Sequence, residues 1–137
     1  MSTTRIRNLS IAIGIVLVAV LAVGMAAITG SRDDSREVTL YARGMAFYLP
    51  GSDAPNPTLR VSAGEHVRIT VVNDDPGVRH DLSVAPLGLT IAPLAATPGS
   101  RGSATLVVPS RPGRYPYVCT FHAQMMRGII EVTPTGR

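Results

Sequence analysis

The chain has a single cysteine, and the residues that follow it are those that bind soft metal ions. His122 lies three positions after Cys119, and Met125 and Met126 lie six and seven positions after the same cysteine. A thiolate, an imidazole and a thioether on one short segment are three of the four ligands of a set that favours copper. The missing ligand of such a set is a second histidine from elsewhere in the chain, and His80 is the candidate. The residues therefore predict a site for one copper ion per chain.

The chemistry of copper explains why these residue types belong together. An ion that alternates between two oxidation states needs a site that both states accept. Three strong equatorial donors with a distant axial thioether provide that compromise geometry. A lone thiol in an oxidising compartment is also a liability unless it is buried or bound to a metal. We therefore interpret Cys119 as a ligand rather than as a structural thiol.

Short alternating segments separated by glycine and proline must position these ligands. Such a pattern, with no helical period after the first thirty residues, predicts an all-β fold, a Greek-key β-sandwich or barrel. Residues 85–101 contain three prolines, and we expect them to cover one end of the sandwich without assigning them a structure. The expected strands are 38–42, 45–49, 58–61, 67–71, 81–85, 103–108, 114–119 and 128–132.

The N-terminal segment differs from the rest of the chain. Between Arg7 and Arg32 lie 24 uncharged residues, enough to span a hydrocarbon core of about 30 Å as a helix. Arg5 and Arg7 precede this segment, so the positive-inside rule places the N-terminus in the cytoplasm. We expect a single-pass membrane protein whose C-terminal domain is periplasmic or extracellular. The expected boundaries are 1–30 for the anchor or signal segment, 31–37 for a tether and 38–137 for the copper domain.

Two properties of the sequence bear on cleavage and on partners. The small-x-small sequence Gly24-Met-Ala26 leaves cleavage of the segment open, in which case the domain would be secreted. Residues 31–137 carry 11 arginines against 9 acidic residues, and the chain has no lysine. Such a mild, scattered excess of positive charge does not suggest a nucleic-acid partner.

Four segments of the sequence carry a more specific pattern. They are VSAGEHVRITVVN at 61–73, the pair His80-Asp81, GRYPYVCTFH at 113–122 and MRGIIEV at 126–132. Together they resemble the cupredoxins, the small blue copper proteins of the plastocyanin, amicyanin and azurin type. The resemblance runs from about residue 38 to the C-terminus. It implies an electron carrier with a type 1 copper site, not an enzyme, whose partners are other redox proteins.

The axial ligand has two candidates in this pattern. Met125 reproduces the shortest cupredoxin spacing, His-x-x-Met, whereas Met126 matches the Met-x-Gly register into the last strand. We favour Met126, because a strand register is harder to shift than a loop length, and we expect Met125 at the surface beside His122. The remaining histidine, His66, flanks the inward-pointing Val67 and is expected to face solvent.

Asp81 is a departure from the family pattern. Many cupredoxins carry asparagine after the first histidine, where its side chain ties the two ligand loops together. An aspartate could accept the same hydrogen bonds but could not donate to the cysteine sulfur. If ionised, it would favour Cu(II) over Cu(I) and lower the reduction potential, which is a hypothesis about the surroundings of the ligands.

The resemblance also implies where electrons leave the site, and the residues of the chain bear on two alternative functions. In such sites the second histidine is the most exposed ligand, so the edge of His122 is the expected exit. The adjacent Met125-Met126 pair keeps open an alternative, an extracytoplasmic protein that binds and delivers Cu(I). A catalytic copper site would need a second copper centre or a free coordination position. The chain has three histidines, and two of them are candidate ligands of the first copper ion, so few residues remain for a second centre. The weakly polar patch around His122 is expected to contain Ala123, Gln124 and one methionine, extended by Pro86, Leu87, Leu89 and Ile91.

Overall fold

A computed structural model of the chain describes residues 35–135, which form nine strands and two short 3-10 helices. All of them belong to one compact unit. The strands are β1 (Arg36–Arg43), β2 (Ala46–Tyr48), β3 (Thr58–Ser62), β4 (His66–Asn73), β5 (Leu82–Val84), β6 (Leu89–Ile91), β7 (Arg101–Val107), β8 (Gly113–Val118) and β9 (Arg127–Thr133). The 3-10 helices are η1 (Ala85–Leu87) and η2 (Thr120–His122).

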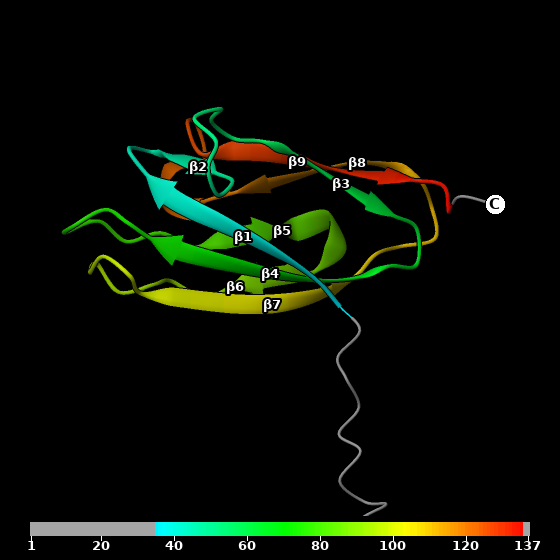
Figure 1. The fold of residues 1–137 in the computed structure, drawn as a ribbon, viewed down its shortest axis with the longest axis horizontal. Coiled ribbons are helices and arrows are strands. Elements are labelled where there is room, and N and C mark those ends of the chain that lie inside the picture. The colour runs from blue at the N-terminus through cyan, green and yellow to red at the C-terminus, as the bar shows by residue number, and fades with distance from the viewer. Residues whose placement is uncertain (1–34, 136–137) are drawn as a thin grey trace, which may run out of the picture. The chain divides into compact units, whose positions relative to one another are not determined.

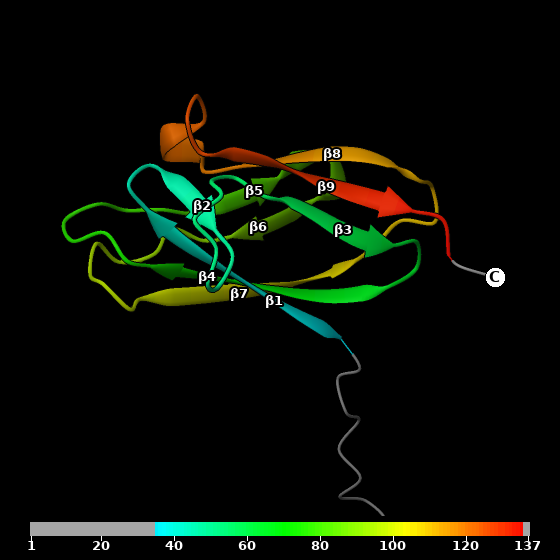
Figure 2. The same ribbon diagram turned by 45° about the horizontal axis from the view of Figure 1, so that its top comes forward.

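The strands form two sheets that pack face to face. One sheet has the order β2-β1-β4-β7 and the other β3-β9-β8-β5-β6, and the two layers are visible in Figure 1 and, turned, in Figure 2. β1 pairs with β4 and β3 pairs with β9 in parallel, while the other pairs are antiparallel. The described residues thus form two packed β-sheets, which confirms the predicted all-β sandwich. Between the strands of each parallel pair the chain crosses to the other sheet.

The alternation of residues within the strands explains how the sheets pack. In β4 the side chains of Val67, Ile69 and Val71 are buried, whereas Arg68 is exposed. Leu40 of β1 lies beside Val71 in the parallel register and is also fully buried. Burying one such side chain contributes about 1.5–3 kcal/mol, so this periodicity fixes which face of each strand is turned inward.

Tyr117 is the largest buried side chain of the core, and Gly128 makes room for it. The two residues are opposite each other in the β8–β9 register. A Cβ atom at Gly128 would lie 2.6 Å from Cε1 of the Tyr117 ring, and closer still to Cζ and the hydroxyl oxygen. The Tyr117 hydroxyl donates a hydrogen bond of 2.7 Å to the carbonyl of Pro57, and the ring packs edge-on against Phe47. Burial also raises the pKa of Tyr117.

One strand was not predicted. Within the segment 85–101 the chain forms η1 and then the three-residue strand β6, which pairs with β5 at the edge of its sheet. Leu89 and Ile91 of β6 are buried. Part of the segment is therefore a strand of the sandwich and not a cover over its end.

The loops that carry the sequence motifs gather at one end of the sandwich. The β4–β5 loop, the β1–β2 turn and η2 lie together there, whereas β1 begins and β9 ends at the opposite end (Figures 1 and 2). β1 starts at Arg36 rather than at Val38, because it pairs with β4 from Val67 onward.

The predicted anchor at 1–30 lies outside the described residues. Across residues 35–135, none of the helices is long and apolar enough to cross a membrane.

Candidate metal centre

His80 and Cys119 come from two neighbouring strands of one sheet. His80 lies two positions before β5, and Cys119 follows β8 directly. The two strands are antiparallel, with Ser83 opposite Val118, so the start of one meets the end of the other. Both side chains are fully buried. Sheet pairing therefore brings together two residues that are 39 positions apart in the chain.

The three equatorial candidates form one cluster. Their ligand atoms all lie within 4.8 Å of one another. The sulfur of Cys119 lies 3.8 Å from Nδ1 of His80 and 3.6 Å from Nδ1 of His122. A divalent ion in a trigonal plane, at about 2.0 Å from nitrogen and about 2.3 Å from sulfur, holds such donors about 3.7 Å apart. The donor set and its spacing fit a single type 1 copper ion.

The loop between β8 and β9 is closed by its own backbone. The N–H of His122 donates to the carbonyl of Cys119 at 3.1 Å, which turns the chain through η2. The N–H groups of Met125 and Met126 both donate to the carbonyl of His122 at 2.9 Å, and the N–H of Cys119 donates to the carbonyl of Met126 at 3.0 Å. This pattern brings Met126 back beside Cys119 at the start of β9.

The two methionines lie in opposite environments. Met126 is fully buried in the same cluster of side chains as Cys119, whereas Met125 is 55% exposed. The backbone carbonyl of Met125 accepts a hydrogen bond of 2.8 Å from the Asn56 side chain, which fixes the loop from outside. A buried thioether beside the cysteine suits a weak axial ligand, so burial supports Met126 over Met125. Met125 lies at the surface, as expected of the methionine that is not a ligand.

Asp81 joins the two ligand segments as predicted for that position. Its side chain is nearly buried, and one carboxylate oxygen accepts a hydrogen bond of 2.6 Å from the N–H of Thr120. The other oxygen accepts a short hydrogen bond from the Thr120 hydroxyl. Both donors belong to the residue after Cys119, so this carboxylate holds the cysteine loop against the histidine segment.

The thiol of Cys119 experiences opposing influences. Burial raises its pKa, and the negative charge of Asp81 acts in the same direction. Hydrogen bonds from the backbone N–H groups of Asp81 and Phe121 lower it. Such donors stabilise a thiolate, and the thiolate is the form that binds a metal.

Asp75 is a site residue that the sequence did not reveal. One of its carboxylate oxygens lies 3.0 Å from Nε2 of His80, on the side of the ring away from Cys119. It precedes His80 by five positions in a turn rich in aspartate and proline. That composition is common in surface turns, so the spacing alone gave no signal.

The surface over the site differs in part from the predicted patch. His122 is half-buried, and Phe121, which was not predicted, is 49% exposed beside it with ring centroids 6.3 Å apart. The guanidinium of Arg79 lies over Phe121 at 5.9 Å. The prediction that Leu89 and Ile91 extend the patch is wrong, because β6 turns both side chains into the core.

The other patch residues follow the prediction more closely. Ala123, Gln124 and Pro86 are exposed, and Leu87 is half-buried. His66 is exposed on β4, so the prediction that it faces solvent is confirmed.

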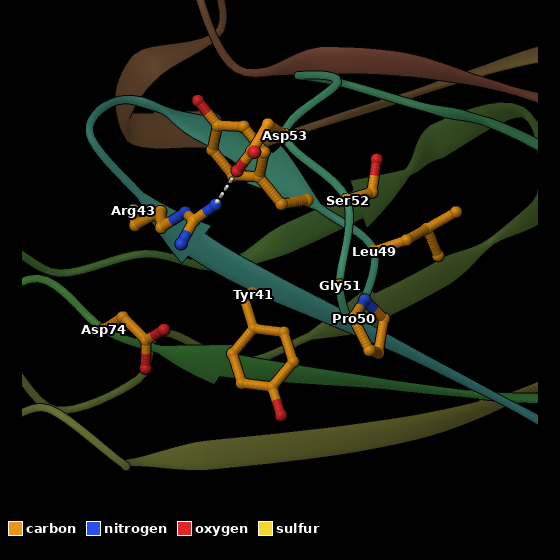
Figure 3. Close-up of a pocket in the computed structure, with 9 residues that line it drawn as sticks. Tyr41, Arg43, Leu49, Pro50, Gly51, Ser52, Asp53 and Asp74 are labelled. Atoms are coloured by element: carbon orange, nitrogen blue, oxygen red, sulfur yellow. Dashed lines mark hydrogen bonds and ion pairs between the residues drawn. The ribbon is translucent and has the colours of Figure 1, made fainter.

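An open pocket elsewhere contains none of the candidate ligands. It lies beside β1 and the loop after β2, where Figure 3 shows Arg43 reaching Asp53. The Arg43 guanidinium lies 4.4 Å from the centre of the Tyr48 ring and pairs with the Asp53 carboxylate at 3.2 Å. The pocket is lined by Tyr41, Arg43, Tyr48, Leu49, Pro50, Gly51, Ser52, Asp53 and Asp74.

Comparison with known proteins gives matches among solved structures. Neither a protein-family model nor a curated protein sequence matches the chain. Auracyanin B is similar with a TM-score of 0.56 and 24% identity, over 77% of this chain and 94% of its own. Auracyanin A, a blue copper protein from Chloroflexus aurantiacus, has a TM-score of 0.53 and 22% identity, over 72% of this chain and 99% of its own.

A rusticyanin variant is similar with a TM-score of 0.50 and 27% identity, over 73% of this chain and 78% of its own. At these identities the likeness concerns the fold, and the site rests on the donor geometry of this chain. Residues 35–135 therefore have the cupredoxin fold, with His80, Cys119, His122 and Met126 gathered where one type 1 copper ion fits.

Proposed function

We propose that the protein carries single electrons between redox partners outside the cytoplasm. The observation that supports this proposal is the set of one thiol and two imidazoles at trigonal spacing, in which His80 and Cys119 are buried and His122 is half-buried. Copper bound there would supply one-electron chemistry by alternating between Cu(I) and Cu(II). Since the set uses all its donors in holding the ion, it favours a carrier over an enzyme that needs an open coordination position.

The chain's own residues keep the site the same in both oxidation states. His80 and Cys119 are fixed by neighbouring strands, and His122 by the backbone hydrogen bonds of η2. The carboxylate of Asp81 ties these segments together through Thr120. Little then moves when the charge of the ion changes, which is what fast electron exchange needs.

Electrons would enter and leave through His122, the ligand with the greatest exposure. Phe121 and Met125 form an exposed apolar surface around it. Brief redox encounters use small interfaces, below about 1,200 Å² in total, and an apolar patch of this kind suits them.

Replacing His122 tests the proposal. The His122→Gly variant should still bind copper but lose the intense colour of a thiolate-Cu(II) site, and added imidazole should restore it by filling the open position. His66→Gly is the matched control, because His66 is exposed on β4 and should leave the spectrum unchanged. Failure of imidazole to restore the colour of His122→Gly would argue against His122 as the exposed ligand.

Copper binding and delivery is the second candidate function. The exposed thioether of Met125, next to the buried Met126, is the observation that favours it. Absorption and paramagnetic resonance spectra of the copper-loaded chain separate the two functions. An electron carrier gives a strongly coloured Cu(II) form that cycles reversibly, whereas a delivery protein holds Cu(I) without colour.

We also propose that residues 1–30 anchor the protein in a membrane with the copper domain outside the cytoplasm. The uncharged segment after Arg7 supports this location. Fractionation of cells that express the full chain tests it. An anchored chain stays in membranes washed at high pH, whereas a cleaved chain is released at a lower mass.

A further inference from the structure

The two ring nitrogens of His80 face different partners. Nδ1 lies 3.8 Å from the Cys119 sulfur, on the side where the metal would bind, and Nε2 lies 3.0 Å from the Asp75 carboxylate. A carboxylate accepts hydrogen bonds and does not donate them when ionised. Nε2 must therefore carry the proton, which leaves the lone pair of Nδ1 free for a metal.

The Asp75 carboxylate is itself held in place. Its second oxygen accepts a hydrogen bond of 3.0 Å from the N–H of Gly44, at the turn between β1 and β2. Its own N–H donates to the side-chain oxygen of Asn73 at 2.9 Å. Asn73 is fully buried, and its amide donates to the carbonyls of Val78 and Ala95.

These contacts make the carboxylate part of the scaffold. Gly44 and Met45 both have positive φ and form a two-residue hairpin turn, in which the Gly44 N–H points at Asp75. The side chain of Asp75 is 19% exposed, and that of His80 is fully buried. A negative group is therefore fixed at hydrogen-bond distance from a buried ligand.

We propose that Asp75 is a positioning residue that selects the His80 tautomer and lowers the reduction potential of the bound copper. This inference rests on the proposed function. A carboxylate bonded to the far nitrogen of a ligating histidine fixes the ring and makes the ligand more basic. Since Cu(II) carries more charge than Cu(I), the negative charge stabilises the oxidised ion more.

Two variants of adjacent residues test the effect on the potential. Asp75→Asn keeps an oxygen that can accept the His80 hydrogen bond but removes the charge. Asp74→Asn is the matched control, because it removes the same charge from an exposed neighbour whose side chain lines the open pocket instead.

Mutation of a partner of this kind typically costs about 10–100-fold in metal affinity. If that loss falls on Cu(II), the potential of Asp75→Asn rises by about 60–120 mV, at 59 mV per tenfold for one electron. Voltammetry of the copper-loaded full chain measures the rise. A shift no larger than that of Asp74→Asn would overturn the effect of Asp75 on the potential.

Nuclear magnetic resonance of the Cu(I) protein tests the tautomer without depending on whether a variant folds. The wild-type chain should show a resonance of the His80 Nε2–H proton that exchanges slowly with water. Asp75→Ala should lose this resonance but keep the resonance of the Tyr117 backbone amide, which reports that the β8–β9 pairing is intact. Absence of the resonance in the wild type would overturn the positioning role. A wild-type chain that binds no copper would overturn the proposed function and this inference together, whereas a blue wild type with an unchanged Asp75→Asn potential refutes only the inference.

Discussion

Replacing Gly128 by alanine should destabilise the fold strongly, although the substitution adds a single methyl group. Gly128 is not among the glycines with positive φ, so its backbone conformation does not require glycine. The restriction comes from Tyr117, whose ring atom Cε1 would lie 2.6 Å from the new Cβ. The ring cannot yield easily, because Tyr117 is fully buried and bonded to Pro57.

The magnitude follows from two costs and one gain. Overpacking a well-packed core costs about 1–3 kcal/mol. Displacing the Tyr117 hydroxyl leaves the Pro57 carbonyl without its donor, at about 1–3 kcal/mol. Alanine recovers about 0.5–1 kcal/mol, because it loses less conformational freedom in a strand than glycine does. The expected net loss is about 3 kcal/mol, which lowers the Tm of a domain of this size by about 12–24 °C.

Thermal and denaturant unfolding of the full chain provide the assay. Gly113→Ala is the matched control: Gly113 is also a strand glycine without positive φ, and its Cβ would lie 3.3 Å from the half-buried ring of Tyr115. This control should cost less than about 1 kcal/mol. In a Tyr117→Leu background the cost of Gly128→Ala should nearly vanish, because the ring that it meets is gone. An equal loss in both backgrounds would refute the assignment of the cost to Tyr117.

Two further predictions concern the ligand surroundings. Asp81→Asn should raise the reduction potential, because it removes a negative charge that is bonded to Thr120 beside Cys119; an unchanged or lowered potential in voltammetry would reject this. Met126→Leu should change the visible spectrum and raise the potential, because it removes the buried thioether that we propose as the axial ligand. Met125→Leu, at the exposed neighbour, should leave both unchanged; the reverse result would make Met125 the ligand.

The sequence predicted those parts of the fold that depend on local pattern. Val67, Ile69 and Val71 alternate with polar residues, and burial of one face follows from that period alone. β6 was missed because three residues between prolines carry too little pattern to distinguish a strand from a loop. The sequence pattern therefore predicts Leu89 and Ile91 at the surface, whereas the structure has them in the core.

The candidate site was predictable where ligand chemistry restricts the residue type. Cysteine, histidine and methionine at short spacing restrict the bound group to a soft metal ion. The register into β9 favours Met126 over Met125 from the sequence alone, and the burial of Met126 supports the same choice. Asp75 and Phe121 were not predictable in this way. Their roles depend on where the β4–β5 turn and η2 direct their side chains, which only the folded backbone determines.

The separation between the ligand end and the entry of the chain has a practical consequence. β1 covers eight residues, at about 3.3 Å each, so β1 begins about 25 Å from the β1–β2 turn, whose Gly44 bonds Asp75 beside His80. A gold surface or an affinity bead attached beside Arg36 or Thr133 would leave the His122 face open to solution. Films of this protein immobilised in that way should thus exchange electrons with dissolved mediators more readily than with the support that holds them.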